Sequence, residues 1–155
     1  MFKPSATKIA QWSRRGGVFR KKLAQRILVL LFSFDLQPTV EVGKNVQFIH
    51  NSLGTVLHSK TVLKDEARIF QGVTLGDANS YVGYCGTKQC KGIIIGKRAT
   101  ICCGATVLCS DGVLEVGDGA IVAAGAVLTQ SIGPNEIWGG VPAHFIKMRD
   151  DSIDS

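Results

Sequence analysis

A repeat of six residues runs through most of the chain and limits the folds that it can adopt. From Leu36 onward a large aliphatic residue or Phe returns at every sixth position, and a small or β-branched residue often follows it four positions later. The large residues are Leu36, Val42 and Phe48, then Leu57, Leu63, Ile69 and Leu75, then Ile95, Ile101 and Val107, and finally Val116, Val122 and Leu128. Strict strand alternation does not give this pattern, whereas a triangular coil with three six-residue faces does. The repeat therefore predicts an all-β solenoid, a parallel β-helix of hexapeptide repeats over residues 35–148.

The six-residue period fails at three places, and regular patterns commonly fail where function requires it. The intervals 48–57 and 107–116 each span nine positions, and the interval 75–95 spans twenty. The longest break predicts a loop that leaves the coil, and long loops on a rigid scaffold commonly carry recognition. The first break contains His50.

The segment around His50 carries a more specific pattern. Residues 35–76 read DLQPTVEVGKNVQFIHNSLGTVLHSKTVLKDEARIFQGVTLG. This resembles the catalytic half of the serine acetyltransferases, in which an Asp-x-x-Pro segment leads by hexads to a His before a Gly-containing turn and then to VTLG. The later runs IGKRATICCGATVL, VGDGAIVAAGAVL and GGVPAHFIK are similar to the closing coils of that family, and HNSLG is closer to short relatives from surface-polysaccharide synthesis. The resemblance implies a left-handed β-helix.

The same resemblance implies transfer of an acetyl group from acetyl-CoA to a hydroxyl group. His50 matches the family's catalytic histidine, and Asp35 matches its carboxylate partner at the family's spacing of fifteen residues. A hydroxyl is a weak nucleophile at neutral pH, so a neutral imidazole suits it as general base, with the carboxylate orienting the ring. In the family, a backbone turn after VTLG receives the oxyanion, which here is Gly76–Asp77. A packed core histidine is the ordinary alternative for His50, but the broken repeat and the matching Asp35 favour the catalytic role.

Small residues in the later coils offer a surface where CoA can approach the backbone. The candidate CoA contacts are Gly104, Ala105, Ala124 and Gly125, with Pro142 near the adenine and Lys147 near a phosphate. Small residues are also what the corners of a β-helix require, so each has a structural explanation as well. In the family that the chain resembles, three β-helices associate in parallel with the donor between neighbours. We therefore expect a homotrimer with acetyl-CoA as co-substrate.

The expected acceptor follows from a departure from the family pattern. Serine-specific members carry an Arg-His-Pro-Lys segment just before the coil that restarts here at Ile95, where this chain has CKGIIIG. The histidine that helps to hold the amino acid's carboxylate is thus absent, and we expect a hydroxyl of a sugar or polysaccharide precursor as acceptor. His58, Tyr81 and Tyr84 are candidate acceptor contacts. The alternatives are a serine O-acetyltransferase of cysteine synthesis and a non-catalytic β-helix scaffold.

Residues 1–34 make a basic N-terminal arm, in which eight Lys and Arg residues precede the first acid, Asp35. Residues 18–34, VFRKKLAQRILVLLFSF, predict a short amphipathic helix whose apolar run falls far short of the ~20 residues that cross a bilayer. This helix either lies on a membrane surface or packs on the main domain or a partner subunit, and a solvated arm is the third alternative. The arm contains no folded nucleic-acid reader motif, so we expect no nucleic-acid partner. Residues 149–155 form a C-terminal tail.

The cysteines and histidines do not form a metal-binding pattern. The chain has five cysteines and no secretory signal, which predicts a cytoplasmic protein with free thiols, peripheral at the inner membrane face if the arm binds lipid. Cys85 and Cys90 lack a second pair at zinc-finger spacing, and the spacing of the histidines does not suit a zinc site of this fold. We expect no metal cofactor. The histidines that lack this spacing are His50, His58 and His144, and Cys102 and Cys103 lie inside a repeat, where small, half-buried side chains are expected.

Overall fold

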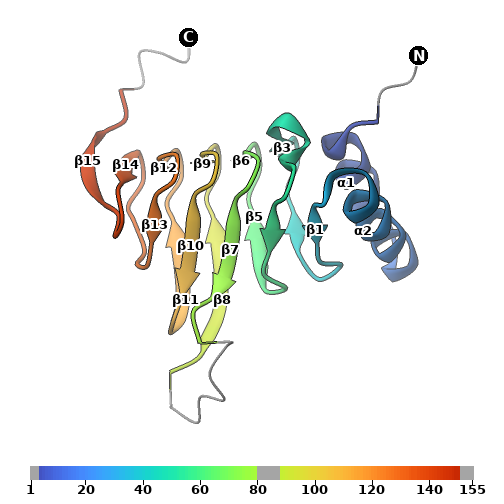
Figure 1. The fold of residues 1–155 in the computed structure, drawn as a ribbon, viewed down its shortest axis with the longest axis horizontal. Helices are drawn as coiled ribbons and strands as arrows, with labels where there is room; N and C mark the ends of the chain where they lie inside the picture. Colours follow the sequence, from blue (N-terminus) through green and yellow to red (C-terminus); the bar gives the residue numbers. More distant parts are fainter. Residues whose placement is uncertain (1–3, 80–87, 151–155) are drawn as a thin grey trace.

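The computed structural model describes residues 4–79 and 88–150, in which a pair of helices is followed by a parallel β-helix (Figure 1). Helix α1 spans Ala6–Arg14 and helix α2 spans Val18–Phe32. Successive coils then contribute short strands to three sheets, so that strands paired within a sheet come from neighbouring coils. The left-handed parallel β-helix of hexapeptide repeats with a short N-terminal helical arm is thereby confirmed.

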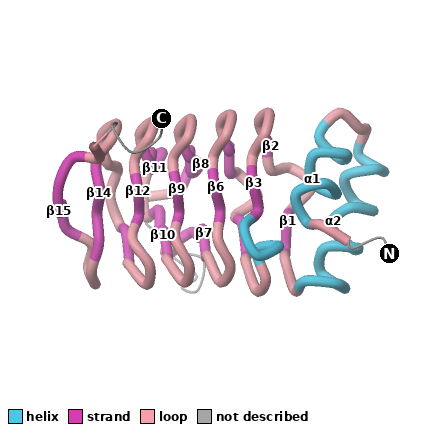
Figure 2. The backbone as a smooth tube through the Cα atoms, turned by 90° about the horizontal axis from the view of Figure 1, so that it is seen from above, coloured by secondary structure: helices cyan, strands magenta, loops and turns pink. Residues whose placement is uncertain are grey.

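The three sheets run along the axis of the solenoid, with the helices at one end and the last strands at the other (Figure 2). Sheet A contains β1 (Asp35–Leu36), β4 (Val56–Leu57), β7 (Thr74–Asp77), β10 (Thr106–Cys109) and β13 (Val127–Leu128). Sheet B contains β2 (Glu41–Val42), β5 (Thr61–Leu63), β8 (Cys90–Ile95) and β11 (Gly112–Val116). Sheet C contains β3 (Gln47–Phe48), β6 (Arg68–Ile69), β9 (Thr100–Ile101), β12 (Ile121–Val122), β14 (Glu136–Gly139) and β15 (His144–Met148).

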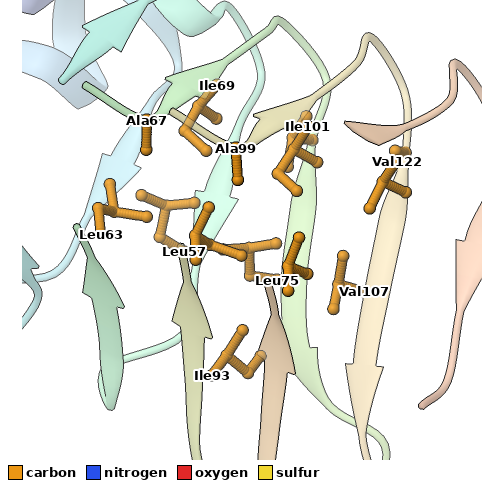
Figure 3. Packing of buried hydrophobic residues seen from close by; sticks show 14 of the residues in the cluster. Leu57, Leu63, Ala67, Ile69, Leu75, Ile93, Ala99, Ile101, Val107 and Val122 are labelled. Carbon is orange, nitrogen blue, oxygen red and sulfur yellow. The ribbon is translucent and has the colours of Figure 1, made fainter. Parts of the chain in front are cut away.

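The large residues of the repeat point into the coil and stack in columns along the axis (Figure 3). In sheet A, Leu57 is level with Leu75, and Leu75 is level with Val107. In sheet C, Ile69 is level with Ile101 in the same way. Every large residue of the repeat is buried apart from Val42, which is partly exposed. Burying each such side chain contributes roughly 1.5–3 kcal/mol, so the columns supply most of the apolar stabilisation of the solenoid.

The corners of the coil explain the small residues of the repeat. Ala67 and Ala99, each four positions after a large residue, are fully buried just before sheet C begins (Figure 3). A larger side chain there would have no room beside the stacked columns. Gly96 is restricted in another way, because a Cβ atom at this position would lie 2.6 Å from the backbone nitrogen of Asp118 in the next coil. The coils therefore approach one another closely at this corner.

The N-terminal arm packs on the first coils. Ala10 of α1 and Leu28 and Phe32 of α2 are buried in the same apolar core as the β-helix. The side-chain amide of Gln11 donates to the backbone carbonyl of Gly43 at 3.1 Å. Of the alternatives for the arm, packing on the main domain is the one that these contacts match. Neither described helix has the length and apolar character needed to cross a membrane.

The C-terminal segment leaves the regular coil. Strand β14 still pairs in parallel with β12, but β15 runs back antiparallel to β14. The segment GGVPAHFIK therefore ends the solenoid as a hairpin, and it does not make a further full turn.

Replacing an interior side chain of a column tests the packing. We predict that Ile101→Ala lowers the free energy of unfolding by about 2–5 kcal/mol, because the cavity cannot close between stacked coils. Val113→Ala, at a position that is 49% exposed on β11, should change it by less than about 0.5 kcal/mol. Urea unfolding followed by circular dichroism at one protein concentration measures both variants. Equal losses for the two variants would contradict the column arrangement.

Candidate active site

His50 lies in η1 (Ile49–Ser52), a short 3-10 turn where the chain passes from sheet C to sheet A. His50, Asn51 and Ser52 all adopt the left-handed backbone conformation, with φ values of 51°, 58° and 46°. This conformation costs a non-glycine residue roughly 1 kcal/mol or more. The first break in the repeat is thus a strained turn that its surroundings must hold in place.

Two hydrogen bonds hold this turn from either side. The backbone N–H of Ala6 at the start of α1 donates to the side-chain oxygen of Asn51 at 3.0 Å. The hydroxyl of Ser52, which is fully buried, donates to the carbonyl of Ile69 in the next coil at 2.9 Å. The imidazole of His50 is left exposed on the outside of the coil, edge-on to the Phe70 ring with the ring centroids 6.2 Å apart. It is therefore accessible to a substrate.

Asp35 begins β1 and is held by two amides. The side chain of Gln25 on α2 donates to one carboxylate oxygen at 2.8 Å, and the side chain of Gln37 donates to the other at 2.9 Å. The backbone N–H of Asp35 donates to the carbonyl of Thr55, just after the turn that carries His50. Among the hydrogen bonds of the described residues, Asp35 makes none to His50. Each carboxylate oxygen can accept more than one hydrogen bond, so the two amides orient the carboxylate and leave acceptor positions for a further donor.

Four of the six candidate CoA residues, Gly104, Ala105, Ala124 and Gly125, lie on the same corner of the solenoid as His50. We call this corner, formed by residues 49–55, 70–73, 102–105 and 123–126, the His50 corner. Its turns are stacked by backbone hydrogen bonds, because Gly104 donates to the carbonyl of Gln71 and Gly125 donates to that of Cys103. A Cβ atom at either glycine would meet no atom within 4 Å, so a ligand can reach the backbone there.

The remaining candidate CoA residues fall into two groups. Ala124 is exposed on the His50 corner, whereas the methyl group of Ala105 is fully buried inside the coil and offers a ligand no surface. Pro142 and Lys147 are exposed at the C-terminal end of the solenoid. The segment before Pro142 continues the corner, since the backbone N–H of Val127 donates to the carbonyl of Gly140.

A groove of about 450 Å³ lies on the outer face of sheet A. Its position is set by β7, because the backbone N–H of His58 donates to the carbonyl of Leu75 at 2.9 Å and so places His58 beside Gly76. Gly76 and Asp77, which were expected in an oxyanion turn, are instead the last two residues of strand β7 and pair with Leu108 and Cys109 of β10. Within one chain, the imidazole next to them is that of His58. His50 lies at the other end of the strands of sheet A, on the corner that precedes them. The groove is lined by Gln37, Val56, Leu57, His58, Ser59, Thr74, Leu75, Gly76, Asp77 and Leu108.

His58 is held as a neutral hydrogen-bond donor. Its Nδ1 accepts the backbone N–H of Lys60 at 3.3 Å, which leaves the ring proton on Nε2. Burial lowers the pKa of His58 below the ordinary value of 6.5, and the attraction of Asp77 opposes this shift. The groove thus presents a neutral imidazole, which can donate a hydrogen bond, beside a carboxylate, which can accept one. This pair is suited to binding hydroxyl groups.

Other candidate residues lie outside the described residues or away from the site. Tyr81, Tyr84 and Cys85 belong to the first group. Cys90 and Cys109 are buried side by side inside the coil, and burial raises the pKa of the Cys90 thiol to about 12, so this thiol stays protonated. Within residues 4–79 and 88–150, no three His, Cys, Asp or Glu side chains gather in a way that could hold a metal ion.

Three residues of the site are not expected from the sequence. Gln37 is identifiable in principle, because it lies two positions after Asp35 in an extended segment and so shares its face. Gln25 reaches Asp35 only through the packing of α2, and Thr74 reaches the groove only through the pairing of β4 with β7. No local signal marks either of them.

The fold and the corner define a hexapeptide-repeat protein of the left-handed β-helix class. No protein-family model matches the chain. The chain is 32% identical over 144 residues to the serine acetyltransferase of Salmonella typhimurium, an alignment that covers 91% of this chain and 48% of the relative. It is also 31% identical over 153 residues to the serine acetyltransferase of Escherichia coli K12, covering 97% of this chain and 52% of that protein.

Solved structures of serine acetyltransferases are also similar to the chain. The serine acetyltransferase of Neisseria gonorrhoeae matches with a TM-score of 0.74 and 25% identity over 95% of this chain and 54% of its own. That of Brucella abortus, solved in complex with coenzyme A, matches with a TM-score of 0.69 and 25% identity over 94% of this chain and 53% of its own. The chain is thus serine acetyltransferase-like, and it spans about half the length of the curated relatives that it matches. These relatives do not support the expected likeness to polysaccharide-synthesis enzymes.

The protonation of His58 can be measured directly. We predict that His58 titrates below pH 6.5 in NMR spectra of the side-chain nitrogens, because burial disfavours its charged form. Asp77→Asn should lower its pKa further, since the attraction that raises it is removed. Glu115→Gln, which removes an exposed carboxylate on sheet B, should leave it unchanged. A His58 that titrates above 6.5 would contradict the downward shift of its pKa by burial.

Proposed function

We propose that the protein is an acyltransferase that moves an acetyl group from acetyl-CoA to an acceptor hydroxyl. The observation that carries this proposal is the similarity to serine acetyltransferases over nearly the whole chain. One of these enzymes was solved in complex with coenzyme A. The matched segment contains the exposed His50 and the open corner that follows it. Because the chain spans about half of these relatives, its activity needs a test of its own and is not taken over from them.

The pantetheine arm would lie along the His50 corner. Gly104, Ala124 and Gly125 leave the backbone open to a ligand there, and the corner leads from His50 toward Pro142. Lys147 at the C-terminal end would meet a phosphate of the nucleotide. Ala105 does not take part in this contact, because its side chain fills the interior.

In the reaction, Nε2 or Nδ1 of His50 takes the proton of the acceptor hydroxyl as the oxygen attacks the thioester carbon. The carbonyl oxygen becomes an oxyanion, which a backbone N–H of Gly76 or Asp77 at the end of β7 would stabilise. When the tetrahedral intermediate collapses, the carbon–sulfur bond breaks, and the thiolate of CoA leaves and takes up the proton from His50. The fixed carboxylate of Asp35 would favour the imidazolium form of His50. No acetylated protein is formed.

This mechanism needs more than one copy of the chain. Within one chain, His50 lies before the strands of sheet A, whereas Gly76 and Asp77 lie at the far end of strand β7, so a single copy does not bring the base and the oxyanion donors together. We infer a parallel homotrimer, in which the side that carries His50 in one copy faces the side that carries Gly76 in the next. A closed ring of three copies would then form three equivalent sites.

Serine is the acceptor that the relatives favour, and a sugar hydroxyl is the second candidate. The sugar candidate is supported by CKGIIIG in the place of the Arg-His-Pro-Lys segment of serine-specific enzymes. The groove on sheet A offers His58, Thr74 and Asp77 as partners for acceptor hydroxyl groups. We propose a cytoplasmic location, because the four described cysteines are free thiols.

Removal of the base tests the mechanism. We predict that His50→Ala lowers kcat by about 100-fold to 10,000-fold, since general-base catalysis contributes that range. Asp35→Asn should lower kcat by a smaller factor. His144→Ala, an exposed histidine on β15, should retain kcat at saturating acetyl-CoA. Release of free CoA thiol measures all of these, and full turnover by His50→Ala would refute the mechanism.

The acceptor is tested in the same assay with L-serine, sugars and sugar nucleotides. We predict CoA release above background with one of these classes, and a variant His58→Phe should raise KM for that acceptor because it removes the Nε2 donor. Release with serine would identify the serine alternative, and release with a sugar would identify the second candidate. If the folded protein binds no CoA and transfers no acetyl group to any of these acceptors, the scaffold alternative is favoured.

A further inference from the structure

Helix α2 buries one side and leaves large apolar residues on the other. Ala24, Leu28 and Phe32 are buried against α1 and the first coil. On the opposite side Phe19 is 83% exposed and Leu30 is 85% exposed. Leu23, on the same face between them, is 40% exposed, and a continuous exposed apolar patch commonly marks an interaction surface.

A basic groove adjoins the start of this helix. It has a volume of about 460 Å³, and Arg20 at its wall lies over the ring of Trp12 with the guanidinium carbon 4.9 Å from the ring centroid. No acidic residue is among the described residues that line it. Lys22 and Arg26 are also exposed on α2 itself. The lining residues are Gln11, Trp12, Arg14, Arg15, Arg20, Lys44 and Asn45.

We propose that the outer face of α2 and this basic groove dock the protein on the surface of a bilayer that contains anionic lipid. Phe19 and Leu30 would enter the boundary between head groups and acyl chains, and the arginines would meet lipid phosphates. Such a helix lies in the plane of the interface and does not cross the membrane.

The charges distinguish a bilayer from the other occupants. A second copy that paired α2 against α2 would bring Lys22 and Arg26 of both copies together without acids to balance them. A nucleic acid would satisfy the cations but would leave Phe19 and Leu30 uncovered. An anionic bilayer offers both an apolar layer and a negative surface, so it matches both features of the arm.

The placement of α2 links this contact to the candidate site. The helices lie at one end of the solenoid, next to the coil that contains Asp35 (Figure 1). Gln25 on α2 donates directly to the carboxylate of Asp35. Docking would therefore hold that coil close to the membrane surface. The docking itself does not depend on the proposed reaction.

Vesicle co-sedimentation of the full chain tests the proposal. We expect binding to vesicles of phosphatidylcholine mixed with phosphatidylglycerol, weaker binding to phosphatidylcholine alone, and a loss of binding as salt is raised. The double variant Phe19→Ser with Leu30→Ser should bind about tenfold or more weakly. Val113→Ser, an exposed apolar position on β11, should bind like the unmodified chain. Circular dichroism and sedimentation velocity check that each variant keeps its fold and its mass.

Three results would overturn the proposal. The first is unmodified chain that stays in the supernatant with the mixed vesicles. The second is equal binding by the double variant and the unmodified chain. The third is a double variant that changes oligomeric mass, which would make the α2 face a contact between copies. If the first result is accompanied by retention on DNA, the arm is assigned to nucleic acid.

Discussion

The stacking of large aliphatic side chains inside a narrow triangular coil is the interaction on which the rest of the structure depends. Because Leu57, Leu75 and Val107 occupy one column, each coil is held at a fixed rotation relative to the next. Positions with the same offset from the column therefore fall on the same corner. Gly104 and Gly125 lie in line with the turn of His50 for this reason, and the corner is a straight, open strip of backbone.

Much of this arrangement is predictable from the sequence, because the repeat specifies which side chains lie inside. The breaks of the period also mark the place of His50 correctly as an irregular turn. What a repeat does not specify is how that turn is supported, since Asn51 bonds to the first residue of α1 and Ser52 bonds to the next coil. The hydrogen bond from Gln25 to Asp35 also joins two separate elements. Contacts between different elements do not appear as a periodic pattern in the sequence.

The structure also separates two histidines that the sequence places close together. His50 lies on an exposed corner next to the strip of glycines, whereas His58 lies in a groove beside Gly76 and is held neutral. A single chain thus places the proposed base before the strands of sheet A, and the groove with the proposed oxyanion donors Gly76 and Asp77 at the other end of those strands. This separation is why the proposed reaction requires neighbouring copies.

The most direct measurement is a crystal structure of the protein with coenzyme A. We expect the pantetheine arm to run along Gly104 and Gly125 of one copy. We further expect the thiol sulfur to lie beside His50 of that copy and beside the backbone at Gly76 of a neighbouring copy. Coenzyme A bound away from this corner, or a thiol remote from every His50, would contradict the account.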